Sequence, residues 1–329
     1  MPDLDPLLRI APWLLLILAA EFVNGWTDAP NAIATVVSTR VLRPHQAVIM
    51  AAVLNAGGAF AGTAVAATIG KGILRAEAID VTTVGAAMMG IVIWSTVAWY
   101  HGLPTSESHG LVAGLAGAGL AVAGPSVLLA EGWRKVFIGI LFSTFLGFAA
   151  GITLMFTIYW VFRRTHPGKV RRIFGRMQVL SAALMAFSHG SNDGQKFIGV
   201  FTLALVLGGI LPVFQVPPWV IVLCAATMAV GTAVGGWRII RTMGVRLTKL
   251  EPVHGFAAET AAGLTIQGAA VLGIPLSTTH TISTAIMGVG ASRRLSAVRW
   301  GVAGNIVLAW ILTFPICGAI AYLTAKLLH

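Results

Sequence analysis

The sequence EFVNGWTDAPNA, residues 21–32, is the most informative stretch of the chain, because its pattern returns at residues 186–197 as AFSHGSNDGQKF. The two aspartates, Asp28 and Asp193, are 165 residues apart, which is half of the 329-residue chain. Both copies place a carboxylate and amides inside apolar sequence, where ionisable groups are costly and mark functional sites. We therefore predict that the two halves of the chain contribute to one shared site.

The composition indicates an integral membrane protein. Hydrophobic residues make up 57% of the chain, charged residues only 10%, and the mean hydropathy is +0.86. Apolar runs such as 81–99 and 298–323 reach the roughly 20 residues that a spanning helix needs. They are rich in Gly and Ala and do not alternate as barrel strands do. We expect an all-α polytopic bundle of about 10–12 transmembrane helices, with a retained first segment at residues 10–20.

The net charge of +11 comes from basic residues in the short gaps between apolar runs. This distribution is a topology signal and argues against a nucleic-acid partner. Residues 163–176 contain Lys and Arg but no acidic residue, so we expect this loop in the cytoplasm.

A second motif is also repeated. LPTSESHG at residues 103–110 matches IPLSTTHT at residues 274–281, with His109 and His280 171 residues apart. Paired interruptions of apolar segments in two halves are typical of secondary transporters whose site lies between inverted repeats. We expect broken or re-entrant helices and two repeats of transmembrane helices, covering residues 10–168 and 169–329.

The hydroxyl-rich motifs predict an anion site. Each follows a proline, and Pro followed by Ser or Thr favours a helix start, whose N–H groups and dipole attract anions. Alternatively, these hydroxyls bond only to carbonyls of the preceding turn. The candidate anion ligands are Thr105, Ser106, Ser108, Ser277, Thr278 and Thr279.

The acidic motifs predict a site for a coupling ion, because carboxylate and amide oxygens are ligands for small cations. Gly25 and Pro30 are the natural points for a helix break in the first copy. The candidates for coupling are Asp28, Asn31, Asn192, Asp193, Lys196 and Glu259. Candidates for gating or proton relay are Asn24, Glu107, His109 and His280.

The two acidic copies differ where Asn31 aligns with Lys196. An ammonium at this position could replace a bound cation or neutralise the anion, and snorkelling to the membrane interface is the alternative. Glu259 could titrate in a proton-coupled cycle or be satisfied structurally. The histidines could equally be packing residues.

These four segments resemble the PiT family of inorganic phosphate transporters. NGWTDAPNAIATVV and HGSNDGQKFIG are similar to that family's two G-x-N-D-x-x-N copies, LPTSESHG and IPLSTTHT to its P-x-S-x-T-H segments, and GFAAETAA to its acidic segment. The resemblance implies a dimeric phosphate symporter with an inverted repeat. It places phosphate near the hydroxyls named above and the coupling ion near Asp28, Asn31 and Asp193.

Departures from the family pattern bear on the coupling ion. Thr27 and Lys196 replace asparagines, Glu107 and Ser108 replace the usual pair, and Asn55 stands about where sodium-coupled relatives carry a glutamate. These changes resemble the bacterial low-affinity branch, which is similar to proton-driven carriers of metal phosphate. We expect a phosphate symporter of the bacterial cytoplasmic (inner) membrane, coupled to protons, with divalent metal phosphate as a further form of the substrate and no cofactor.

Several alternatives stay open at this point. A sulfate permease of the same fold or a sodium-coupled phosphate symporter would carry the same motifs. A passive channel is a further possibility. A hydrolase using Ser106 or Ser108 is disfavoured, because adjacent residues rarely form a triad and the second copy lacks the acid. We therefore expect a transporter and not an enzyme.

Overall fold

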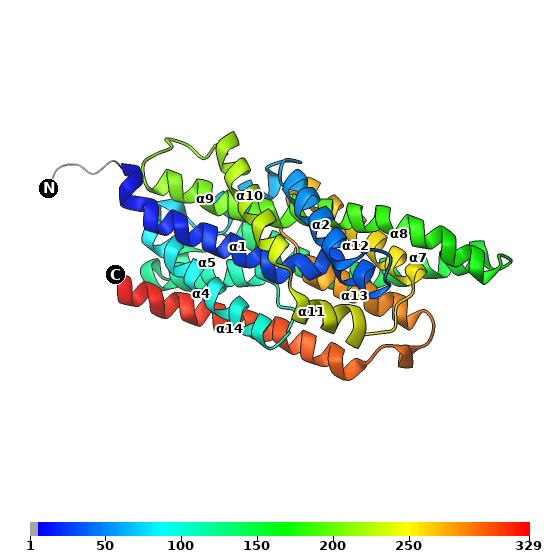
Figure 1. Ribbon diagram of the computed structural model, residues 1–329. Helices are drawn as coiled ribbons and strands as arrows, with labels where there is room; N and C mark the ends of the chain where they lie inside the picture. Colours follow the sequence, from blue (N-terminus) through cyan, green and yellow to red (C-terminus); the bar gives the residue numbers. More distant parts are fainter. Residues whose placement is uncertain (1–5) are drawn as a thin grey trace.

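The computed structural model describes residues 6–329, and the described chain folds into a bundle of α-helices (Figure 1). In chain order the helices are α1 (Pro6–Ser38), α2 (Pro44–Ala59), α3 (Ala64–Gly72), α4 (Val81–Tyr100), α5 (Glu107–Ala123), α6 (Ala130–Leu141), α7 (Gly147–Phe162), α8 (Pro167–His189), α9 (Gln195–Leu207), α10 (Pro218–Val234), α11 (Trp237–Arg241), α12 (Pro252–Val271), α13 (Thr278–Ala291) and α14 (Trp300–Leu328). The predicted all-α class is confirmed.

Short irregular helical turns join some of these helices. Three are π-helical, at Phe142–Leu146, Gly190–Gly194 and Thr242–Arg246. Three are 3₁₀ turns, at Ala76–Ala78, Pro125–Val127 and Leu295–Ala297. The π-turn at Gly190–Gly194 contains the second acidic motif, which fits the frequent occurrence of π-bulges at functional sites.

Several helices have the length and composition of membrane spans. α1, α4, the continuous stretch from α6 to α7, and α14 each qualify alone. Two bent pairs qualify as well if each is taken as one broken span: α2 with α3, bent by 68°, and α10 with α11 and its π-turn, bent by 59°. The chain is therefore a multi-pass membrane protein with interrupted helices.

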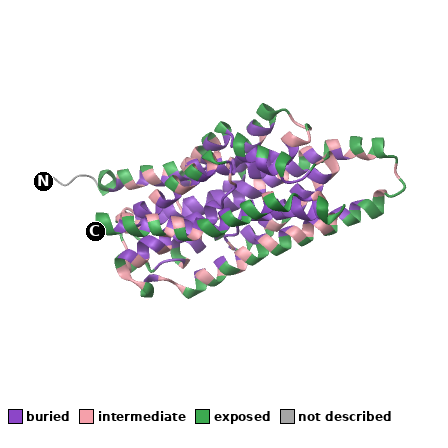
Figure 2. Cartoon of the chain, turned by 90° about the horizontal axis from the view of Figure 1, so that it is seen from below, coloured by how far each residue is buried: buried purple, intermediate pink, exposed green. Residues whose placement is uncertain are grey.

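Burial separates a lipid-facing surface from a polar interior. Large apolar side chains such as Leu15, Trp160 and Ile311 are more than 60% exposed on the outside of the bundle. Figure 2 shows this exposed outer surface in green around a buried interior. Two apolar clusters form the interior, and α1 contributes residues 10–20 to one and residues 32–36 to the other. The polar part of the first acidic motif lies on α1 between these two clusters.

The bent pairs occupy corresponding places in the two halves. α1 packs on α10 and α4, whereas α8, which leads into the second acidic motif, packs on α2 and α12. α5 and α13 each begin directly after a non-helical linker that contains the repeated proline. The division into repeats at residue 168 stays a prediction, and it falls in the first turn of α8.

The expected helix break at Gly25 or Pro30 is wrong, because α1 runs unbroken through both residues. Gly25 serves close packing instead: a Cβ there would lie 2.4 Å from the carbonyl oxygen of Met228 on α10. The matching Gly190 allows the same approach to α2, since a Cβ would lie 2.0 Å from the carbonyl oxygen of Asn55. The repeated glycines thus bring each acidic motif against a bent helix.

Replacing Gly190 with Ala is expected to lower the free energy of unfolding by about 1–3 kcal/mol, because the added methyl would overlap the α2 backbone. Thermal unfolding of the purified protein in detergent measures the change. Gly57→Ala on α2 is the matched control, since a Cβ there meets no atom within 4 Å. Equal melting temperatures for the two variants would contradict this packing role.

Candidate functional site

Two helices start inside the bundle, as the hydroxyl motifs predicted. Ser106 caps α5, and its Oγ accepts a hydrogen bond from the His109 amide at 3.2 Å. Ser277 caps α13 in the same way, accepting from the His280 amide at 3.1 Å. These four residues are all at least 96% buried. The two cap hydroxyls are therefore used by their own helices, while the dipole ends of α5 and α13 remain within the core.

The acidic motifs meet the hydroxyl motif of α13. Thr278 donates to Oδ2 of Asp193 at 2.7 Å, and Thr279 donates to Oδ1 of Asp28 at 3.2 Å. The side-chain amide of Asn31 donates to both threonine hydroxyls, at 3.2 Å and 2.9 Å. Residues from α1, from the π-turn after α8 and from α13 thus form one buried cluster. The sequence repeat predicted this meeting of the two halves.

Lys196 is fully enclosed in the same cluster rather than extended to the interface. Its Nζ donates to Oδ1 of Asp193, to Oγ of Ser108 and to the carbonyl oxygen of Leu276, the last at 2.9 Å. The side chain is 2% exposed. Snorkelling is therefore excluded in this structure. The ammonium lies among three oxygen atoms, which is the kind of ligand set that a small hard cation would take.

The contacts of Lys196 mirror those of its counterpart Asn31. Asn31, on α1, contacts Thr279, the residue that aligns with Ser108. Lys196, on α9, contacts Ser108 on α5. Each acidic motif therefore contacts the hydroxyl motif of the other half. The aligned pair occupies equivalent positions with different charge.

His189 belongs to this cluster and was missed in the sequence analysis. Its Nε2 lies 3.2 Å from Oδ2 of Asp193 and 3.9 Å from Oδ2 of Asp28. Its Nδ1 lies 3.1 Å from Oδ1 of Asn55. Alignment of the repeats offered a signal, because His189 occupies the position of Asn24, a second place where the copies differ in chemistry.

Glu107 lies near the first motif but is already paired. Its Oε1 accepts from Thr27 at 2.9 Å and its Oε2 accepts from Ser95 at 2.6 Å. Thr105 is buried in the linker before this glutamate. Both carboxyl oxygens thus face hydroxyl groups of α1 and α4, which ties the start of α5 to these helices.

Some predicted residues lie outside the central contacts. Glu259 accepts from Thr35 at 2.5 Å, from Gln178 at 3.1 Å and from Ser181, so its cluster joins α1, α8 and α12. Asn24 donates to Glu21 at 2.9 Å. Asn192 donates to the carbonyl oxygen of Ile274 at 3.2 Å, in the linker before α13. Among the described residues, no side-chain hydrogen bond joins Glu259 to Asp28 or Asp193.

The two motif histidines lie against each other. The rings of His109 and His280 are 4.4 Å apart at 87°, and Trp310 stacks on His280 at 3.6 Å. Trp310 also donates to the carbonyl oxygen of Pro104 at 3.0 Å. The pair therefore connects the starts of α5 and α13, with α14 packed behind it. This arrangement fits a packing role as well as a relay.

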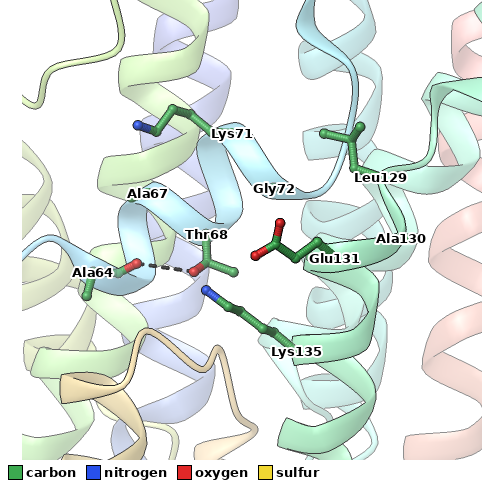
Figure 3. A pocket seen from close by; sticks show the side chains of 10 residues that line it. Ala64, Ala67, Thr68, Lys71, Gly72, Leu129, Ala130, Glu131 and Lys135 are labelled. Carbon is green, nitrogen blue, oxygen red and sulfur yellow. Dashed lines mark hydrogen bonds between the residues drawn. The ribbon is translucent and has the colours of Figure 1, made fainter.

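A cavity of about 400 Å³ lies between α3 and α6 (Figure 3). Its polar side chains are Thr68, Lys71, Glu131 and Lys135. Thr68 donates to the carbonyl oxygen of Gly273 at 2.8 Å, in the linker that leads to Ser277. The side chains that line the cavity thus sum to one net positive charge, and the cavity borders the linker that leads to Ser277.

Two further cavities, of about 650 and 670 Å³, share Thr248, Lys249 and Arg299. These two cavities lie at the start of α14. At the opposite end of α14, Asp80 contacts His329 at 3.4 Å. The 29 residues of α14 span about 44 Å at 1.5 Å per residue. The α3–α6 cavity, lined by Gly72 and Leu129, lies near the Asp80 end, because a bridge joins Leu74 to Leu128. Cavities therefore open at both ends of the bundle.

A multi-pass helix bundle with a buried charged site, and with basic cavities toward both ends, defines an integral membrane transporter. The model of the phosphate transporter family matches residues 24–321. The chain therefore belongs to the phosphate transporter family, as the sequence resemblance predicted. It is a phosphate transporter of the PiT family embedded in the lipid bilayer, and not an enzyme.

Known relatives are similar to this chain over almost its whole length. A probable low-affinity inorganic phosphate transporter of Rhizobium meliloti (strain 1021) is 46% identical, over 95% of this chain and 96% of its own. One of the same name from Bacillus subtilis (strain 168) is 39% identical, over 94% and 95%. A solved structure, the sodium-dependent phosphate transporter, superposes with a TM-score of 0.90 over 97% of this chain and 98% of its own, at 23% identity. This last likeness confirms the fold.

Proposed function

We propose that this protein is a secondary-active symporter that moves inorganic phosphate across the bacterial cytoplasmic (inner) membrane, driven by protons. The observation that carries the proposal is Lys196, whose ammonium lies among Asp193, Ser108 and the Leu276 carbonyl. A covalently attached cation at this position removes the need for a sodium ion there. A proton is then the coupling ion that the remaining acidic groups can take up.

Phosphate is proposed to bind where the starts of α5 and α13 face the acidic motifs. Ser108, Thr278 and Thr279 offer hydroxyls there, and the helix dipoles favour an anion. In the present arrangement these hydroxyls are engaged by Asp28, Asp193 and backbone. Binding therefore includes an exchange of partners, in which phosphate oxygens accept some of the hydrogen bonds that the carboxylates now accept.

Alternating access would connect this site to either end of the bundle in turn. The cavity with Lys71 and Lys135 would admit phosphate at one end, and the cavities with Lys249 and Arg299 would receive it at the other. The second end includes Arg171, which lies on α8 because the expected loop at residues 163–176 is helical from Pro167 onward. The segment 163–176 is basic, so we place this end in the cytoplasm. We also propose that the protein forms a homodimer, on the basis of its resemblance to the PiT family alone.

Uptake of labelled phosphate into proteoliposomes tests the proposal. We expect phosphate to accumulate with an inward proton gradient in sodium-free buffer. A roughly tenfold excess of sulfate over phosphate should have little effect on this uptake. Uptake that needs sodium would contradict proton coupling and support sodium symport. Displacement by sulfate would instead favour a sulfate permease, and equilibration without accumulation a channel.

A further inference from the structure

One of the two cavities at the start of α14, of about 670 Å³, is strongly basic. Its lining, which we call the basic recess, combines small residues with four basic side chains: Thr248, Lys249, Arg293, Arg294, Ser296, Ala297 and Arg299. No lining residue is acidic. Within residues 6–329, none of the four basic side chains forms a salt bridge. The recess therefore gathers four positive charges without a counter-charge from the protein.

The walls of the basic recess are held together by hydrogen bonds between two segments of the chain. The Thr248 hydroxyl donates to the carbonyl oxygen of Ala297 at 2.9 Å, and the Arg299 amide donates to the carbonyl oxygen of Leu247 at 3.0 Å. Between these bonds, Val298 is 2% exposed and packs in one of the two apolar clusters. The connection from α13 to α14 is thus fixed against the segment before α12. A preformed site of this kind loses less entropy when a ligand binds.

Helix dipoles account for only part of this gathering of charge. Arg293 and Arg294 closely follow the end of α13, where basic side chains are favourable. Arg299, however, is the N-cap residue of α14, whose first turn contains no acidic residue. A cation is unfavourable at that positive end of a dipole, and an anion is favourable. Lys249 comes from a third segment. The convergence of these charges therefore indicates an anionic ligand.

The basic recess also borders the lipid. The connection between α13 and α14 lies at one end of the bundle (Figure 1), and α14 is a candidate membrane span. Leu295, between two lining residues, is 69% exposed, and Trp300, directly after Arg299, is 50% exposed. The Trp300 indole donates to the carbonyl oxygen of Leu295 at 2.9 Å. Tryptophan is typical of the membrane interface, so the recess lies at the level of the lipid headgroups.

We propose that the basic recess binds the headgroup of an anionic phospholipid. Guanidinium groups bind phosphate oxygens through paired hydrogen bonds, and the Lys249 ammonium adds a point charge. Basic pockets between membrane helices on the cytoplasmic side are typical sites for acidic lipid headgroups. The volume of about 670 Å³ exceeds that of a single phosphate group, so the glycerol part of the headgroup fits as well. The acyl chains then extend along Leu295 and Trp300.

Such a lipid would connect three parts of the bundle: the end of α13, the start of α14 and the segment before α12. α13 is the helix whose first turn carries Thr278 and Thr279, so the lipid would stabilise a helix of the central site. The neighbouring cavity, lined by Arg40 and Arg171, stays free for the proposed path of phosphate. Lipid binding itself does not depend on the proposed symport.

Titration of the purified full-length protein in detergent with phosphatidylglycerol, followed by native mass spectrometry, tests the proposal. We expect one tightly bound phosphatidylglycerol per chain. Phosphatidylcholine with the same acyl chains has no net charge and should bind at least about tenfold more weakly. The double variant Arg293→Gln/Arg294→Gln should lose about tenfold or more in affinity for phosphatidylglycerol. Arg299→Gln, which removes a different charge of the recess, should act in the same direction.

The double variant Arg172→Gln/Arg176→Gln is the matched control. It removes the same number of exposed positive charges from α8, outside the recess, and should bind phosphatidylglycerol as the wild type does. Thermal unfolding without lipid establishes that each variant is folded. Phosphatidylglycerol should then raise the melting temperature of the wild type and the control more than that of the Arg293/Arg294 variant, because a ligand of the native state stabilises it.

Three results would overturn the proposal. The wild type could bind both lipids equally, or the folded recess variants could bind phosphatidylglycerol as tightly as the wild type. Equal losses in the two double variants would show a general attraction to basic surface instead of a site. Finally, inorganic phosphate alone could stabilise the wild type but not the Arg293/Arg294 variant. That result would assign the recess to free phosphate and refute the lipid.

Discussion

Replacing Asp193 with asparagine is expected to abolish phosphate uptake. Asp193 accepts from Lys196 and Thr278 and faces His189, so it is the side chain on which the cluster converges. Asparagine has nearly the same shape but no charge, and it would leave the Lys196 ammonium buried without a counter-charge. Removing one partner of a buried ion pair costs about 3–5 kcal/mol, which corresponds to at least about a hundredfold loss of the transport-competent state.

Initial rates of phosphate uptake into proteoliposomes measure this loss, with the amount of reconstituted protein matched. Asp28→Asn should act in the same direction, because Asp28 is the aligned carboxylate of the same cluster. Asp80→Asn provides the control: Asp80 caps α4 at the end of the bundle, and asparagine caps a helix as well as aspartate does. Normal uptake by the Asp28 and Asp193 variants would refute the shared site.

Replacing Lys196 with asparagine is expected to change the coupling ion. The variant would carry an amide in both copies of the motif, as at Asn31, and would leave an open position among Asp193, Ser108 and the Leu276 carbonyl. A sodium ion fits such an oxygen set. Proton-driven uptake should fall by about tenfold or more, because the variant loses the strong, charge-assisted hydrogen bonds that the Lys196 ammonium donates. A sodium gradient should restore part of the uptake.

Uptake by the Lys196→Asn variant is measured with a proton gradient, a sodium gradient, or both. Lys169→Asn serves as the control, because Lys169 is exposed at the start of α8 and should keep the wild-type dependence. Thermal unfolding with and without sodium adds a readout of ion binding that needs no transport. A folded variant that keeps full proton-driven uptake and ignores sodium would show that Lys196 is not the internal cation.

Much of the fold follows from the sequence because the signals are local. Mean hydropathy defined the membrane class, and a proline followed by Ser106 or Ser277 predicted the two helix starts through capping alone. The pairing of acidic and hydroxyl motifs followed from their repetition at matched spacing. Ionisable and polar side chains are costly in apolar sequence, so those of each repeated motif need hydrogen-bonding partners. The other repeated motifs offered such partners.

Other features depend on tertiary contacts that the sequence does not encode locally. Gly25 has the residue type of a helix break, and it is the nearness of the Met228 carbonyl that makes a glycine necessary there. His189 lies directly before Gly190, in the last turn of α8, and no motif in the sequence marked it. Only its contacts with Asn55 and Asp193 give it a role. Glu259 resembled a member of the central site, but its three partners on α1 and α8 place it in a separate cluster.

Proton movement during phosphate uptake tests the central claim most directly. Proteoliposomes that contain an entrapped pH-sensitive dye, in sodium-free buffer, receive a pulse of external phosphate. We expect internal acidification that follows phosphate uptake, that is absent with the Asp193→Asn variant, and that sulfate does not produce. Phosphate uptake that leaves the internal pH unchanged and begins only when sodium is added would contradict it.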